Sequence, residues 1–173
     1  MNLRTLAAAL FVCTASPAQD PDRVVDPQLH GWAMYFGDHP VSDRWGLHLE
    51  GQWRRDGAYT SWQQLLLRPG VNFQLSPSWM FTAGYCFVDT HRYGGYPVAA
   101  RFPEHRIYQQ AQMRNTTGRV QWLHRFRLEQ RFLGEMQGGE VVRWRHENRY
   151  RHMLRATVPL RGKTIARGAW YLA

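Results

Sequence analysis

Side chains alternate between apolar and polar with a period of two along most of this chain after residue 30. The alternation is clearest in 44–54, 64–75, 79–88, 119–132 and 142–160, weaker in 107–114, and shorter in 32–36 and 165–173. Successive side chains of a β-strand point to opposite faces of a sheet, so this period predicts strands. Tight turns predicted at 76–78, 115–118 and 161–163 alternate with longer loops predicted at 55–61, 89–104 and 134–140. The sequence therefore predicts an all-β fold, an antiparallel up-and-down meander of about seven or eight strands.

The apolar face of these strands is predicted to point outward. A soluble β-sheet protein turns its apolar face inward, whereas an outer-membrane barrel turns it towards lipid. The segments are long enough to span a bilayer as tilted strands. Aromatic residues such as Trp45 and Trp53 lie near strand ends, and charged residues such as Arg127 and Glu129 lie in mid-strand. No apolar run reaches the roughly 18 residues that a spanning helix needs. We therefore expect an outer-membrane-type β-barrel.

The first 18 residues have the pattern of a secretory signal peptide. Arg4 supplies a positive start, a short apolar run follows, and small residues precede an expected cleavage site after Ala18. We expect 19–30 to be irregular and 31–173 to form the barrel domain. Export by this route, together with the expected barrel, predicts location in the outer membrane of a Gram-negative bacterium.

Arginine dominates the charge of the chain. All but one of the 22 basic residues are arginine, and the formal net charge is +9. The alternation places these charged side chains on the polar faces of their strands: Glu50, Arg68, Arg125, Arg127, Glu129, Arg131, Arg143, Arg145, Glu147, Arg149 and Arg151. A guanidinium stays charged and binds carboxylates through two parallel hydrogen bonds. We expect these residues to line a net-positive lumen.

The last two long segments are predicted to form a hairpin with cross-strand ion pairs. Placing its centre at Gln137 sets Arg127 opposite Glu147 and Glu129 opposite Arg145. Shifting the register one way would oppose Glu129 to Glu147, which like-charge repulsion disfavours. A shift the other way would pair Glu147 with Arg125 and Glu129 with Arg143, and this register stays open. An earlier hairpin centred near Tyr59 would set Glu50 opposite Arg68.

Several segments, taken in order, resemble those of one bacterial family. They are the Trp- and Leu-rich segment 45–55 with its inward acid, Gly84-Tyr85, Glu104-His105-Arg106 leading into Gln109-Gln110, the segment 125–132, and Arg149-Tyr150-Arg151. From about residue 32 to its end the chain resembles the domain-of-unknown-function 2490 family, predicted outer-membrane β-barrels. The resemblance implies this fold and location but no catalytic residues, since the family has no established activity. Members continue through further strands, so the resemblance also implies a C-terminally incomplete barrel.

The expected role is passive: a small porin-like channel for anionic solutes, or a structural barrel. Its expected partners are outer-membrane lipid, the barrel-assembly machinery during biogenesis, and small anionic solutes. Export and inward-facing arginines argue against binding to nucleic acid. The first alternative is a soluble periplasmic β-barrel that binds an apolar ligand.

The second alternative is an outer-membrane lipid hydrolase. The serines after the signal peptide, Ser42, Ser61, Ser76 and Ser78, fall in turns or loops without a catalytic motif. We therefore expect no enzyme. The histidines lack the spacing of metal ligands, and no glycine-rich phosphate loop is present. We expect neither a metal nor a cofactor.

Overall fold

The computed structural model describes residues 29–57, 59–93, 100–160, 162 and 170–173. The signal peptide predicted at 1–18, and all but the last two residues of the irregular segment predicted at 19–30, lie outside the described residues. Within the described part, no helix is long and apolar enough to cross a membrane.

The described chain forms one antiparallel sheet. Its strands are β1 (His30–Pro40), β2 (Trp45–Asp56), β3 (Ser61–Ser76), β4 (Trp79–Thr90), β5 (Phe102–Thr117), β6 (Val120–Gln137), β7 (Glu140–Pro159) and β8 (Tyr171–Leu172). Each strand pairs with the next along the chain, so the spatial order equals the sequence order. The predicted all-β antiparallel meander is confirmed.

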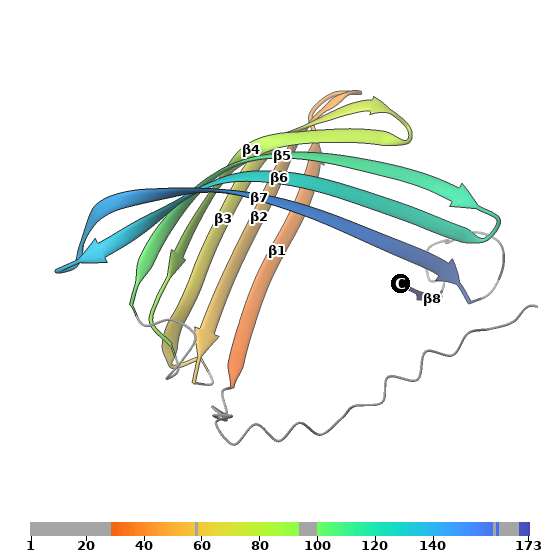
Figure 1. Cartoon of the computed structure of the whole chain (residues 1–173). Helices are drawn as coiled ribbons and strands as arrows, with labels where there is room; N and C mark the ends of the chain where they lie inside the picture. Colours follow the sequence, from red (N-terminus) through yellow and green to blue (C-terminus); the bar gives the residue numbers. More distant parts are fainter. Residues whose placement is uncertain (1–28, 58, 94–99, 161, 163–169) are drawn as a thin grey trace, which may run out of the picture.

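The sheet is curved and strongly twisted, and it is open. Figure 1 shows β5, β6 and β7 running at a wide angle to β1, β2 and β3, so the sheet arches over a hollow. In the described residues β1 pairs only with β2, and β7 pairs with β6 and, over two residues, with β8. Two strand edges are therefore left without a partner strand within the described part of the chain.

The turn between β6 and β7 is tighter than predicted. A loop was expected at 134–140, but β6 continues to Gln137 and β7 starts at Glu140. Gly138 and Gly139 have φ values of 61° and 91°. Glycine adopts such positive values without steric cost, and a pair of them makes the two-residue turn that suits a twisted hairpin.

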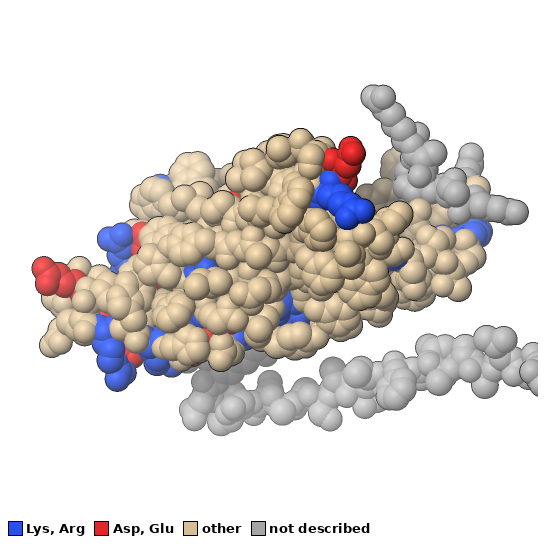
Figure 2. All heavy atoms as spheres, turned by 90° about the horizontal axis from the view of Figure 1, so that it is seen from above, with Lys and Arg blue, Asp and Glu red and all other residues tan. Residues whose placement is uncertain are grey.

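The two faces of the sheet differ in polarity as predicted. The concave face carries the buried polar and charged residues, among them Glu50, Arg68, Asn72, Thr82, Glu104, Arg106, Gln110, Arg127 and Glu129. The convex face carries large apolar side chains that are 40–54% exposed, among them Trp45, Leu47, Leu49, Trp53, Leu67, Val71, Phe81, Tyr85, Ile107, Leu128 and Leu154. From above the arch, most of the visible surface is uncharged, and charged groups gather mainly at its margins (Figure 2).

A tyrosine packed on two glycines joins three central strands on the concave face. The side chain of Tyr108 in β5 is fully buried. A Cβ atom added at Gly70 would lie 2.3 Å from the Tyr108 hydroxyl, and one added at Gly84 would lie 2.9 Å from its ring. An aromatic ring over strand glycines restores the packing that glycine lacks. Because these two glycines have no Cβ atoms, the Tyr108 ring can pack closely against the backbone of β3 and β4.

Candidate functional site

The concave face encloses a cavity of about 810 Å³ to which β1 to β7 all contribute side chains. Ten of its lining residues are arginines, whereas three are Asp or Glu. The period of two explains this placement, because every second residue of a strand faces the same side. The site is therefore a charged hollow with an excess of positive charge.

Glu129 in β6 is the centre of this charge arrangement. It is fully buried. Four guanidinium groups surround its carboxylate: Arg149 at 2.6 Å, Arg151 at 3.5 Å, Arg68 at 3.6 Å and Arg106 at 3.9 Å. A buried carboxylate is stable only when it is paired, and here four arginines from three strands, β3, β5 and β7, supply that pairing.

A second buried pair joins β2 to β3. Arg68 lies directly opposite Glu50 in the sheet and donates a hydrogen bond from Nη1 to its Oε2. The Glu50 and Arg68 side chains are 3% and 5% exposed. Gln52 also donates from Nε2 to Glu50 at 2.5 Å. The predicted opposition of Glu50 and Arg68 is confirmed.

Further ion pairs continue across β5, β6 and β7. Arg106 donates two hydrogen bonds, of 2.7 and 2.8 Å, to the carboxylate of Glu104 on its own strand. Arg131 in β6 reaches Glu104 at 2.5 Å on one side and Glu147 at 3.1 Å on the other. Together with Glu129 and Glu50, these contacts connect charged groups from β2 to β7.

The predicted ion pairs between β6 and β7 are wrong. Arg127 lies opposite Arg151, Glu129 opposite Arg149, and Arg131 opposite Glu147. The turn centres between Gly138 and Gly139 rather than at Gln137, and an irregularity at Glu135 and Met136 shifts the register further. Because of these two displacements, the hairpin has none of the three registers considered from the sequence.

One consequence concerns Arg145, which does not meet Glu129. Its Nη1 lies 2.8 Å from Glu147 on the same strand, and its Nε lies 3.9 Å from Glu135. Arg143 forms two hydrogen bonds of 2.8 Å with Glu135. These exposed pairs lie near the turn, away from the cavity.

The ring of Tyr108 lies between two arginines. The guanidinium of Arg68 is 5.6 Å from the ring centre and that of Arg127 is 5.4 Å away. Arg127 also donates two hydrogen bonds, of 2.9 and 2.6 Å, to Oε1 of Gln110. Arg127 is thus held by a cation–π contact with Tyr108 and by the neutral amide of Gln110, and not by a carboxylate.

Of the residues predicted to face the lumen, Glu50, Arg68, Arg125, Arg127, Arg131, Arg149 and Arg151 line the cavity. Glu129 lies beneath them and contacts four arginines, whereas Arg143, Arg145 and Glu147 lie closer to the β6–β7 turn. The predicted set of lumen residues omits Glu104, Arg106 and Tyr108, because the sequence predicts a loop at 89–104 and only a weak strand at 107–114. A usable signal was present: Glu104, Arg106, Tyr108, Gln110, Gln112 and Arg114 are spaced by two.

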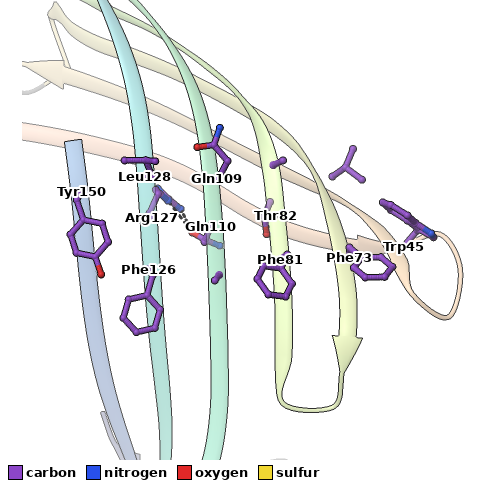
Figure 3. A pocket seen from close by; sticks show the side chains of 13 residues that line it. Trp45, Phe73, Phe81, Thr82, Gln109, Gln110, Phe126, Arg127, Leu128 and Tyr150 are labelled. Carbon is purple, nitrogen blue, oxygen red and sulfur yellow. Dashed lines mark hydrogen bonds between the residues drawn. The ribbon is translucent and has the colours of Figure 1, made fainter. Parts of the chain in front are cut away.

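A second hollow, of about 520 Å³, lies on the convex face. Figure 3 shows aromatic side chains along it from Trp45 to Tyr150, carried by β2 to β7. Ala83 and Ala111 are small, so the surface is lower between Phe81 and Phe126. This hollow is an apolar groove on the outside of the sheet.

Charged groups also meet where the β4–β5 connection begins and ends. Arg101 donates hydrogen bonds of 3.0 and 2.8 Å to Asp89, and His91 lies 3.2 Å from the same carboxylate. The Asp89 carboxylate raises the pKa of Arg101 above its usual value.

No group of three potential metal ligands is found among the described residues. The hydroxyls of Ser42 and Ser76 accept hydrogen bonds from the backbone N–H groups of Trp45 and Trp79.

These observations define a class: an antiparallel β-meander whose charged side chains face its hollow and whose apolar side chains face outward. The chain belongs to a family described as "Protein of unknown function (DUF2490)", whose model matches residues 29–173. No curated protein and no solved structure matches the chain. The family resemblance identified from the sequence is confirmed.

Proposed function

We propose that this protein is an outer-membrane β-barrel whose concave face lines an arginine-rich, water-filled lumen that admits small anionic solutes. One observation carries the proposal: the polarity of the two faces. Glu129 is fully buried on the concave side, whereas Leu128, the residue before it, is 42% exposed on the convex side. Lipid on the convex face would cover that apolar surface, and water in the hollow would solvate the charges.

Aromatic side chains near strand ends support this orientation. Trp45 begins β2 and packs on Phe73 with ring centres 4.8 Å apart. Near the other end of the sheet, Trp53 and Trp62 lie 6.0 Å apart. Tryptophan is favoured at both interfaces of a membrane, where its ring meets hydrocarbon and its N–H meets water.

The proposal requires that both open edges become paired in the membrane. Unpaired backbone N–H and C=O groups are costly in hydrocarbon. We propose that barrel-assembly machinery brings about this pairing, within the chain or between chains.

The two alternatives have less support. A soluble barrel that binds an apolar ligand would place its apolar groove inside, whereas the groove at Phe81 and Phe126 lies on the outside. A lipid hydrolase would need a serine close to a histidine. Ser42 and Ser76 instead accept hydrogen bonds from the backbone within turns.

The test is fractionation of a Gram-negative host that expresses the full chain. We expect the protein in the outer-membrane fraction, resistant to extraction by sodium carbonate and released by detergent. In planar bilayers the purified protein should conduct anions in preference to cations. Recovery of folded protein from the soluble periplasm would contradict the membrane location, and cation preference would contradict the role given to the arginines.

A further inference from the structure

We propose that five arginines at one end of the hollow form a binding site for a small soluble polyanion that bears phosphate or carboxylate groups. This arginine cluster consists of Arg114 in β5, Arg125 and Arg127 in β6, and Arg151 and Arg155 in β7. All five line the cavity of about 810 Å³. The inference rests on the proposed function, because it requires that solutes in water can enter this hollow.

The cluster differs from the rest of the concave face because it lacks acids. Among the described residues no carboxylate lies within 4.0 Å of Arg114, Arg125, Arg127 or Arg155. The acid nearest to Arg151 is Glu129 at 3.5 Å, and Glu129 already pairs with Arg149 at 2.6 Å. The positive charge of the cluster is therefore not balanced within the described chain.

The register brings these like charges together. Arg127 lies directly opposite Arg151, and Arg114 and Arg155 lie on either side of Leu123. Like charges directly opposite each other destabilise a sheet. A fold that keeps such local conflicts commonly does so at a functional site. A bound anion would remove this repulsion.

The dimensions of the cluster favour a ligand with more than one anionic group. The cluster extends over three strands, and four residues along β6 separate the Leu123 and Arg127 levels. With strands about 4.8 Å apart and a rise of about 3.4 Å per residue, it covers roughly 10 Å by 14 Å. One carboxylate is too small to contact it all. The cavity volume lies within the range of about 300–1,000 Å³ seen for small-molecule sites.

Arginine is suited to such a ligand because its planar fork binds phosphate and carboxylate oxygens in pairs. The surroundings of Arg127 favour this use, because its partner, Gln110, is a neutral amide. A ligand oxygen would therefore compete with an amide rather than with a carboxylate.

The experiment measures binding of inorganic tripolyphosphate to the full chain in detergent micelles by titration calorimetry, with orthophosphate as the smaller probe. It is run in about 0.15 M NaCl, where exposed charges are screened beyond about 8 Å. We expect saturable binding, tighter for tripolyphosphate. Arg125→Gln and Arg155→Gln should each weaken it about tenfold, since each removes a charge-assisted contact.

The matched control is Arg143→Gln, which removes the same charge from the same face near the β6–β7 turn. It should leave binding unchanged. An equal loss in Arg143→Gln, or no saturable binding by the unaltered chain, would overturn the inference. If Arg125→Gln loses its β-type circular dichroism, Arg125→Lys replaces it and should retain weaker binding, because lysine keeps the charge without the fork.

Further outcomes distinguish a soluble ligand from a lipid headgroup, and a failure of this inference from a failure of the proposed function. Adding phosphatidylglycerol to the micelles should not displace tripolyphosphate, and displacement would assign the site to lipid headgroups instead. A chain that enters membranes but binds no tripolyphosphate contradicts this inference alone. A chain that is soluble without detergent and binds tripolyphosphate contradicts the membrane proposal alone.

Discussion

Removing either partner of the Glu50–Arg68 pair should destabilise the sheet, and removing both should cost less than the sum of the two losses. Both side chains are nearly inaccessible, at 3% and 5% exposed. Loss of one partner leaves the other charge buried and unpaired, which costs about 3–5 kcal/mol in a dry interior and less in a hydrated lumen. Arg68 would retain Glu129 at 3.6 Å, which limits the loss in Glu50→Gln. We therefore expect a coupling energy of about 1–3 kcal/mol.

The assay is a double-mutant cycle with Glu50→Gln, Arg68→Gln and the double variant. Unfolding by urea in detergent micelles is followed by tryptophan fluorescence. The matched cycle uses Glu135 and Arg143, a pair with two hydrogen bonds whose side chains are 40% and 69% exposed. Its coupling should be smaller, because solvent screens exposed pairs. Additive losses at Glu50 and Arg68, or an equal coupling in both cycles, would refute the view that burial gives the pair its strength.

Two further substitutions, each with a matched control, test the packing at Gly84 and the environment of the convex face. Gly84→Ala places a methyl group 2.3 Å from the Pro69 carbonyl oxygen and 2.6 Å from the Gly70 Cα atom, so we expect a loss of about 1–3 kcal/mol in urea unfolding. Gly51→Ala has no heavy atom within 4 Å of its new Cβ atom and should be neutral; equal losses in both would contradict the view that close packing at Gly84 causes the loss. Leu128→Arg places a charge on the convex face near the middle of β6 and should cost about 2–4 kcal/mol in a bilayer. Gln121→Arg, the same change of charge on the concave face of that strand, should be tolerated; an unaffected Leu128→Arg variant would mean that the convex face meets water.

The Glu50–Arg68 opposition could be predicted because a hairpin centre near Tyr59 gives the register found at these residues, although the pairing shifts between Arg54 and Arg55 closer to the turn. The β6–β7 register could not, although both strands alternate equally well. Alternation fixes which face a side chain occupies, but a hairpin register depends on turn geometry. Recognition of Gly138-Gly139 as a two-residue turn would have moved the centre, whereas the irregularity at Glu135 has no clear sequence signal.

Strand β5 was underestimated for a different reason. Gln109 lies on the apolar convex face and interrupts the pattern there. In the structure Gln109 and Gln130 exchange two hydrogen bonds of 3.2 Å, so each amide satisfies the other on that face. Such cross-strand compensation is invisible within a single segment. Because the sequence predicts this strand only over 107–114, after a loop that ends at Glu104, neither Glu104 nor Arg106 is among the predicted lumen residues.

Fluorescence quenching of single labels on the two faces of the sheet shows which face meets lipid and which meets water. Leu128→Cys labels the convex face and Arg125→Cys labels the concave face, and the unaltered chain gives the background from buried Cys86. Each protein is reconstituted into vesicles and exposed to brominated lipid or to aqueous iodide. We expect brominated lipid to quench the label at 128 and iodide to quench the label at 125. Iodide quenching at 128 without quenching by brominated lipid would contradict an outer-membrane barrel with its apolar face towards lipid.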